Sequence, residues 1–165
     1  MNKIFLFLLL LFPLLAKAAD FDIVKPGQQP ATIVVDTTDW TGVRLAARDL
    51  SADIGRVCGK AAPVLVATAA HQPGQGCIIA GTMGKSKLID NIVKAHKTDV
   101  RKLHGQWESY LIDVVDGNLV VIGSDKRGTI YGIYEISREM GVSPWYWWAD
   151  VAVKHQDHII YSSGR

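Results

Sequence analysis

The feature that most constrains the fold is a buried strand followed closely by an amphipathic helix. Residues 32–35 read Thr-Ile-Val-Val, which is typical of a buried strand. Beyond them the apolar residues recur at helical spacing, at Val43, Ala46, Ala47, Leu50, Ile54 and Val57. Gly59 follows where such a helix is expected to end. A strand, a helix and further strands together predict a sheet with helices packed on it.

The same alternation continues along the rest of the chain. We expect further strands at residues 63–67, 77–80, 107–115, 119–122 and 158–161, and further helices from about residue 86 and over residues 128–140. Asp116-Gly117-Asn118 is typical of a hairpin turn between two of these strands. Residues 19–30 are expected to be a lead-in. The order predicts an α/β chain with one mixed sheet, as an α+β two-layer sandwich, with a three-layer arrangement as the alternative.

The first 18 residues have the pattern of a secretory signal. A short basic head with Lys3 precedes a 12-residue apolar run, and Ala16-Lys17-Ala18 fits the small-x-small cleavage pattern. We therefore expect residues 1–18 to be removed and residues 19–165 to form one secreted or periplasmic domain. The apolar run is too short to span a bilayer comfortably, so no membrane partner is expected after its removal.

Charge and cysteine content disfavour several other classes of protein. The chain has 18 Lys and Arg against 16 Asp and Glu, and the expected signal holds two of the lysines and no acid. The remaining neutral chain lacks the bulk charge that holds a nucleic-acid backbone. Cys58 and Cys77 leave a disulfide and two separate buried thiols both open. Without a CxxC spacing they predict no zinc site.

A glycine-bearing turn at residues 81–86 lies between an expected strand and an expected helix. It invites comparison with a phosphate-binding loop, but Ile79 stands where that loop needs its first glycine, so the turn is two residues too short. A turn that requires glycine is the favoured interpretation. A small anion held by the amides of the following helix is the alternative.

A second turn, Ser124-Asp125-Lys126-Arg127, also joins a strand to a helix. Ser124 or Asp125 can cap the helix, whereas Lys126 and Arg127 oppose the preference of the helix dipole. Two cations beside an acid suit a carboxylate ligand or a neighbouring domain. Solvated bases beside a capped turn remain the alternative.

A run of large aromatic residues, Trp145-Tyr146-Trp147-Trp148, lies near the C-terminus. Four adjacent aromatic side chains cannot all enter one small core, so at least one is expected on a surface that meets something. Packing against another domain, stacking on a sugar ring and burial in the core all stay open. No residue in the chain is predicted to be catalytic, and no metal or other cofactor is predicted.

Four segments occur in an ordered series: Gly81–Asp90, Trp107–Tyr110, Gly123–Tyr134 and Gly141–Asp150. Together they resemble the N-terminal domain of glycoside hydrolase family 115, the xylan α-1,2-glucuronidases, over nearly all of residues 19–165. A looser Arg-Gly-x-x-Tyr-Gly pattern at residues 127–132 is similar to the accessory domains that precede other sugar-cleaving (β/α)8 barrels.

The resemblance implies an exported hydrolase that removes glucuronic or 4-O-methylglucuronic acid from xylan with inversion, by an acid and a base on a following barrel. With 165 residues the chain has no room for that barrel, so a truncated, non-catalytic domain that is inactive alone is expected. Its partner would be the catalytic barrel or glucuronoxylan. A stand-alone carbohydrate-binding module and a nonfunctional gene fragment are the alternatives. The resemblance assigns six residues to substrate binding or to the edge that faces the barrel: Asp125, Lys126, Arg127, Trp145, Trp147 and Trp148.

Overall fold

The computed structural model describes residues 20–68, 70, 73–95 and 97–162, and the expected signal lies outside them. Five strands form the main sheet in the order β3-β2-β4-β6-β5. They are β2 (Thr32–Asp36), β3 (Val64–Ala67), β4 (Cys77–Thr82), β5 (Tyr110–Val115) and β6 (Asn118–Gly123). Neighbours pair in parallel from β3 to β6, and only β5 runs antiparallel, as the first strand of a hairpin with β6.

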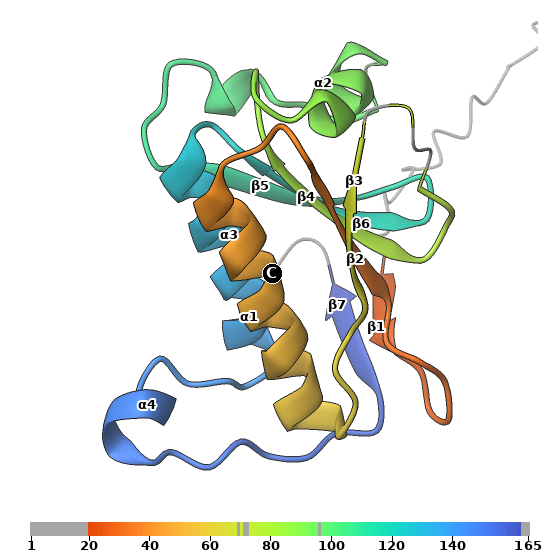
Figure 1. Ribbon diagram of the computed structural model, residues 1–165, viewed down its shortest axis with the longest axis vertical. Helices are drawn as coiled ribbons and strands as arrows, with labels where there is room; N and C mark the ends of the chain where they lie inside the picture. Colours follow the sequence, from red (N-terminus) through yellow and green to blue (C-terminus); the bar gives the residue numbers. More distant parts are fainter. Residues whose placement is uncertain (1–19, 69, 71–72, 96, 163–165) are drawn as a thin grey trace, which may run out of the picture.

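Helices cover both faces of this sheet (Figure 1). The three main helices are α1 (Thr41–Cys58), α2 (Lys87–Lys94) and α3 (Lys126–Glu139). Ile33 and Val35 share a core with α1 and α3, whereas Val34 between them faces the core under α2, because alternate residues of a strand point to opposite faces. The mixed sheet with packed helices is confirmed. Its layering is the three-layer alternative and not the two-layer sandwich, because the strands are apolar on both faces.

A second, two-stranded sheet pairs β1 (Asp20–Val24) with β7 (Ile159–Ser162) in antiparallel fashion. It was not expected that residues 20–24 would form a strand. Phe21 lies opposite Tyr161, and Phe21 and Ile23 pack into the core shared by α1 and α3. The two ends of the described chain therefore lie side by side (Figure 1).

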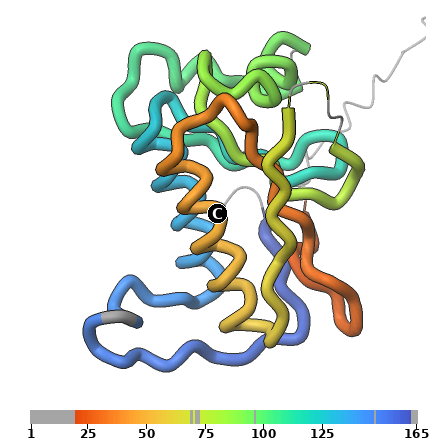
Figure 2. The backbone as a smooth tube through the Cα atoms, viewed as in Figure 1, coloured from red at the N-terminus to blue at the C-terminus, as the bar shows by residue number. Residues whose placement is uncertain are grey.

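The remaining elements are short. A 3-10 turn η1 spans Arg101–Leu103, and α4 spans Tyr146–Ala149. α4 belongs to residues 143–158, here called the arm, which runs out from the end of α3 and returns to β7 (Figure 2). Cys58 and Cys77 are free thiols, so the disulfide left open by the sequence is not formed. Within the described ranges, no helix is both long and apolar enough to cross a membrane.

The parallel strands place three helix starts at one side of the molecule. β2, β4 and β6 each lead through a short turn into α1, α2 and α3, respectively. The carboxyl ends of these strands and the first turns of all three helices therefore meet along one side of the sheet, here called the carboxyl edge. In sheets of this kind ligands bind outside the carboxyl ends of the strands, where the strand order reverses. That point here lies between β2 and β4.

Candidate functional site

At the point where the strand order reverses, between β2 and β4, the chain buries a carboxylate of its own. Asp36 is fully buried, and its Oδ2 accepts a 3.1 Å hydrogen bond from the amide of Leu88 in the first turn of α2. Its Oδ1 accepts the amide and the hydroxyl of Thr38, both at 2.8 Å. Burial acts to raise the pKa of Asp36, but these hydrogen bonds outweigh it and hold the pKa below its ordinary value. Asp36 thus neutralises the helix start at which a small anion was the alternative.

A second buried carboxylate links β4 to the start of α1. Asp39 accepts the amide of Trp40 at 2.7 Å and the amide of Thr82 at 2.8 Å. Burial raises the pKa of Asp39 above its ordinary value. Both of its oxygens are engaged by backbone amides, so Asp39 has a structural role.

Of the two caps that the sequence leaves open, Ser124 and Asp125, it is Asp125 that caps α3. Its Oδ1 accepts the amide of Gly128 at 2.8 Å, and its Oδ2 accepts the amide of Glu108 at 2.9 Å. These two amides lower the pKa of Asp125. One side chain therefore caps the helix and also fixes the segment that precedes β5.

The two cations of this turn differ in their surroundings. Arg127 donates from Nη1 to Oε1 of Glu108 at 2.6 Å, and the guanidinium stays two thirds exposed. Lys126 is exposed and has no ion-pair partner within the described part of the chain. Sequence reasoning did not find Glu108 as the partner of Arg127.

Trp107 is a further site candidate. Sequence reasoning placed it at the start of a strand and in one of the segments of the family resemblance, but not among the site residues. Its side chain is 86% exposed, and hydrogen bonds hold the backbone that follows it. The amide of Ser124 donates to the carbonyl of Ser109 at 2.9 Å, and the amide of Ser109 donates to Oγ of Ser124 at 3.1 Å. A Cβ at Gly128 would lie only 2.2 Å from the carbonyl oxygen of Ser109, so only glycine permits this close packing.

The aromatic run lies at the opposite end of α3 from Asp125. Trp145 is 65% exposed and Trp148 is 84% exposed, while the side chain of Trp147 lies outside the described set. Arg56, in the last turn of α1, lies over the ring of Tyr146 at 5.1 Å. α3 has 14 residues and so spans about 21 Å between the two groups. The structure therefore does not bring Asp125, Lys126 and Arg127 together with the tryptophans of the arm (Figure 2).

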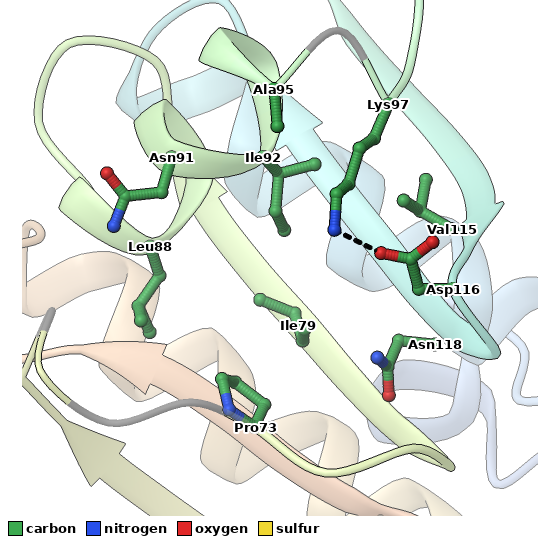
Figure 3. A pocket seen from close by; sticks show the side chains of 10 residues that line it. All are labelled: Pro73, Ile79, Leu88, Asn91, Ile92, Ala95, Lys97, Val115, Asp116 and Asn118. Atoms are coloured by element: carbon green, nitrogen blue, oxygen red, sulfur yellow. Dashed lines mark hydrogen bonds and ion pairs between the residues drawn. The ribbon is translucent and has the colours of Figure 1, made fainter.

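A pocket under α2 offers a different candidate (Figure 3). Ile79, Leu88 and Ile92 form apolar walls, and Lys97 and Asp116 form an ion pair at its rim. Its volume is about 170 Å³, below the roughly 300–1,000 Å³ of ordinary small-molecule sites. We therefore do not take it as the functional site. Within the described ranges, no group of three or more His, Cys, Asp or Glu side chains is placed to hold a metal ion.

Comparison with known proteins places these features in a family context. Residues 23–136 match the family model described as glycosyl hydrolase family 67 N-terminus. Among solved structures, the chain is similar to a family GH115 4-O-methyl-α-glucuronidase, BtGH115A, with specificity for decorated arabinogalactans. The two share 36% sequence identity with a TM-score of 0.70, over 84% of this chain and 17% of that chain. No match was found among curated proteins.

Proposed function

This chain belongs to the family of glycosyl hydrolase family 67 N-terminal domains, and from that premise we propose that it is the non-catalytic accessory domain of a secreted or periplasmic α-glucuronidase of the GH115 type. It spans only 17% of the glucuronidase that it resembles, which leaves room there for a separate catalytic domain. On this proposal the complete enzyme removes glucuronic or 4-O-methylglucuronic acid side chains from a polysaccharide such as glucuronoxylan, with inversion.

The main support for the non-catalytic role is that the carboxylates at the carboxyl edge are already engaged by hydrogen bonds and an ion pair. Inversion needs one carboxylic acid to protonate the leaving oxygen and one carboxylate to activate a water. Asp36, Asp39 and Asp125 each have both oxygens engaged by amide or hydroxyl donors of the chain. Glu108 is paired with Arg127. No carboxylate among these four is free to exchange a proton with a sugar, so the proposal assigns the chemistry to another domain.

The arm supplies the surface by which we propose that this domain meets the catalytic domain. Trp145 and Trp148 expose 65% and 84% of their surfaces, and Val151 exposes 42%. Large exposed apolar side chains that lie close together mark interaction surfaces, and tryptophan is enriched where interfaces gain most of their energy. The stacking of Arg56 on Tyr146 ties the arm to α1, so the indoles are presented from an anchored segment.

A hybrid enzyme tests this proposal. This chain would replace the segment that it matches in BtGH115A, and release of 4-O-methylglucuronic acid from a decorated arabinogalactan would be measured. We expect the chain alone to release none and the hybrid to release it. The double change Trp145→Ala and Trp148→Ala should lower the activity or the thermal stability of the hybrid, because both depend on the domain contact.

Leu65→Ala is the matched control for that experiment. Leu65 is 39% exposed and lies on β3, an edge strand of the main sheet and not part of the arm. Its removal should leave the hybrid unchanged. Uronic acid release by the chain alone would contradict the non-catalytic role. A folded hybrid that is insensitive to the loss of both tryptophans would contradict the contact through the arm.

A further inference from the structure

We propose that Trp107 and the hollow beside it form a binding site for one pyranose ring of a glycan chain. This site lies at the carboxyl edge and goes beyond the accessory role proposed above, which depends on the arm. The hollow has a volume of about 370 Å³, within the usual range for small-molecule sites. Met83, Leu103 and Trp107 form its apolar walls, and His104, Gln106 and Asp125 contribute polar groups.

The first argument is that the indole is exposed on a backbone that hydrogen bonds hold in place. Trp107 is the most exposed of the large apolar side chains described, at 86%. The hydroxyl of Ser109 donates to the carbonyl of Trp107 at 3.0 Å, and the amide of Glu108 is held by Asp125. Because the backbone is fixed and tryptophan has only two side-chain torsions, little further freedom is lost when a ligand stacks on the indole, which favours binding.

The second argument is a strained residue next to the indole. The backbone of Glu108 has a φ of 54°, in the left-handed region that residues other than glycine rarely adopt. Such a conformation is unfavourable and is kept where the surroundings enforce it, commonly at binding sites. Here the enforcing contacts are the hydrogen bond to Asp125 and the ion pair with Arg127. Together they fix the direction in which Trp107 leaves the backbone.

The third argument is the chemistry of the hollow. A pyranose has an apolar C–H face and a rim of hydroxyl groups, so it fits a flat aromatic ring that is flanked by donors and acceptors. The exposed side chains of His104 and Gln106 make no hydrogen bond with another described residue. Each carboxylate oxygen of Asp125 accepts one amide and has a second acceptor position for a hydroxyl. Apolar and polar groups thus alternate around the hollow as they do around a sugar.

The charges at the site favour a sugar ring over a phosphate. The Arg127 guanidinium is paired with Glu108, and Asp125 is ionised because its hydrogen bonds lower its pKa. A phosphate would meet the negative charge of Asp125 without an unpaired cation on the walls of the hollow. Hydroxyl groups, in contrast, both donate and accept. A neutral pyranose and a uronate-bearing pyranose share the apolar face and the hydroxyl rim and differ by one carboxylate, which Asp125 would repel if it pointed into the hollow, so the experiment must compare them.

Two-dimensional NMR of the 165-residue protein tests the proposal, because each of the five tryptophans gives its own indole N–H signal. The probes are a neutral xylo-oligosaccharide and the same oligosaccharide carrying 4-O-methylglucuronate. We expect a saturable shift of the Trp107 signal with at least one of them. Trp107→Ala should weaken binding tenfold or more, Trp107→Phe should retain part of it, and Ile160→Ala, on β7, should leave it unchanged.

The outcomes separate this inference from the accessory role. No saturable shift with either probe, or binding that survives Trp107→Ala, overturns the site. Binding that is lost in Trp148→Ala and kept in Trp107→Ala also overturns it, and would place sugar contact on the arm. The fold of each variant is checked by its thermal unfolding, which the loss of so exposed a side chain should hardly change. If the hybrid enzyme is active but this chain binds neither oligosaccharide, the Trp107 site is refuted and the accessory role is not.

Discussion

The backbone amide of Glu108 donates a 2.9 Å hydrogen bond to Oδ2 of Asp125, across 17 residues of sequence. The other oxygen of the same carboxylate accepts the amide of Gly128. One side chain therefore caps α3 and holds the backbone next to Trp107. The start of a helix and the orientation of an exposed indole are coupled through a single acid, which makes Asp125 the most informative residue of the carboxyl edge.

Replacing Asp125 by Ala should lower the free energy of unfolding by about 2 kcal/mol, because a helix cap is lost and the amide of Glu108 loses its acceptor. Urea unfolding measures the change. Asp157→Ala is the control, since Asp157 is largely exposed and pairs with the exposed side chain of His155. Its effect should stay within about 0.5 kcal/mol. Equal stability of the two variants would contradict the role of Asp125 as an anchor.

The same contacts predict an acid dependence. Because the pKa of Asp125 is lowered in the folded state from its ordinary 3.8, the folded protein binds this proton less readily than the unfolded chain. The stability that Asp125 contributes is therefore complete above about pH 4 and is lost as the pH falls through the lowered value. Urea unfolding between pH 2 and pH 6 should show a weaker pH dependence for Asp125→Asn than for the wild type. Parallel curves would contradict this assignment.

A glycine at the first turn of α3 is expected to be irreplaceable for steric reasons. A Cβ at Gly128 would meet the carbonyl oxygen of Ser109 at 2.2 Å, a backbone atom that cannot move alone. Gly128→Ala should destabilise the protein by about 1–3 kcal/mol despite the better helix propensity of alanine. Gly74→Ala, with nothing within 4 Å of the added carbon, should be neutral or slightly stabilising. Thermal unfolding compares the two, and equal melting temperatures would refute the contact.

Local patterns in the sequence predict much of the fold. The buried run in β2, the helical spacing in α1 and the start of α2 at Ser86 all depend on residues within a few positions of one another. β1 was missed because its short sequence alone does not indicate a strand. It is stabilised by pairing with β7, which lies at the other end of the chain. The second layer of helices was left as an alternative, because apolar strands do not show which face each helix covers.

The same distinction between local and long-range interactions applies to the candidate site. The cap at Asp125 is local to α3 and was predicted, as one of two alternatives. The partner of Arg127 was not, because Glu108 comes near it only through the pairing of Tyr110 with Gly123 in the hairpin. Arg127 and Trp148 were assigned to one edge, whereas α3 separates them by most of its length. Sequence reasoning therefore did not predict how these residues are grouped in space, and their roles in binding stay predictions.

Asp36 should contribute to the stability of the protein, although it belongs to neither of the two proposed binding surfaces. Asp36→Ala would leave the buried amide of Leu88 without its acceptor, at a cost of about 1–3 kcal/mol. The amide of Thr38, which lies closer to solvent, would lose its acceptor as well. Asp36→Asn keeps one acceptor oxygen and should fall between the wild type and Asp36→Ala in urea unfolding. Identical midpoints for Asp36→Ala and the wild type would show that the first turn of α2 does not need Asp36 as an acceptor.

The raised pKa of Tyr134 predicts that the folded protein loses stability in alkaline solution. Burial and the hydrogen bond to Asp49, 2.7 Å from its hydroxyl, raise the pKa of Tyr134 to about 12. The unfolded chain ionises near the ordinary value of 10, so the stability from this residue is complete below pH 10 and is lost as the pH rises toward 12. Tyr134→Phe should reduce the pH dependence of urea unfolding between pH 9 and pH 11. An unchanged slope would rule out a perturbed Tyr134.

Arg127 separates a role in stability from a role in recognition. Its ion pair with Glu108 is largely exposed and so is worth less than about 1 kcal/mol, and Arg127→Ala should hardly change urea unfolding of the isolated chain. In the hybrid glucuronidase the same change should raise the KM or lower the stability of the hybrid, if Arg127 binds the uronate or holds the catalytic domain. Arg127→Lys keeps the charge but not the planar fork, and should recover only part of the effect. Arg138→Ala is the matched control, because Arg138 is also exposed and paired, with Glu135, but lies at the far end of α3. A hybrid with Arg127→Ala that equals the wild-type hybrid in both KM and stability would remove Arg127 from either role.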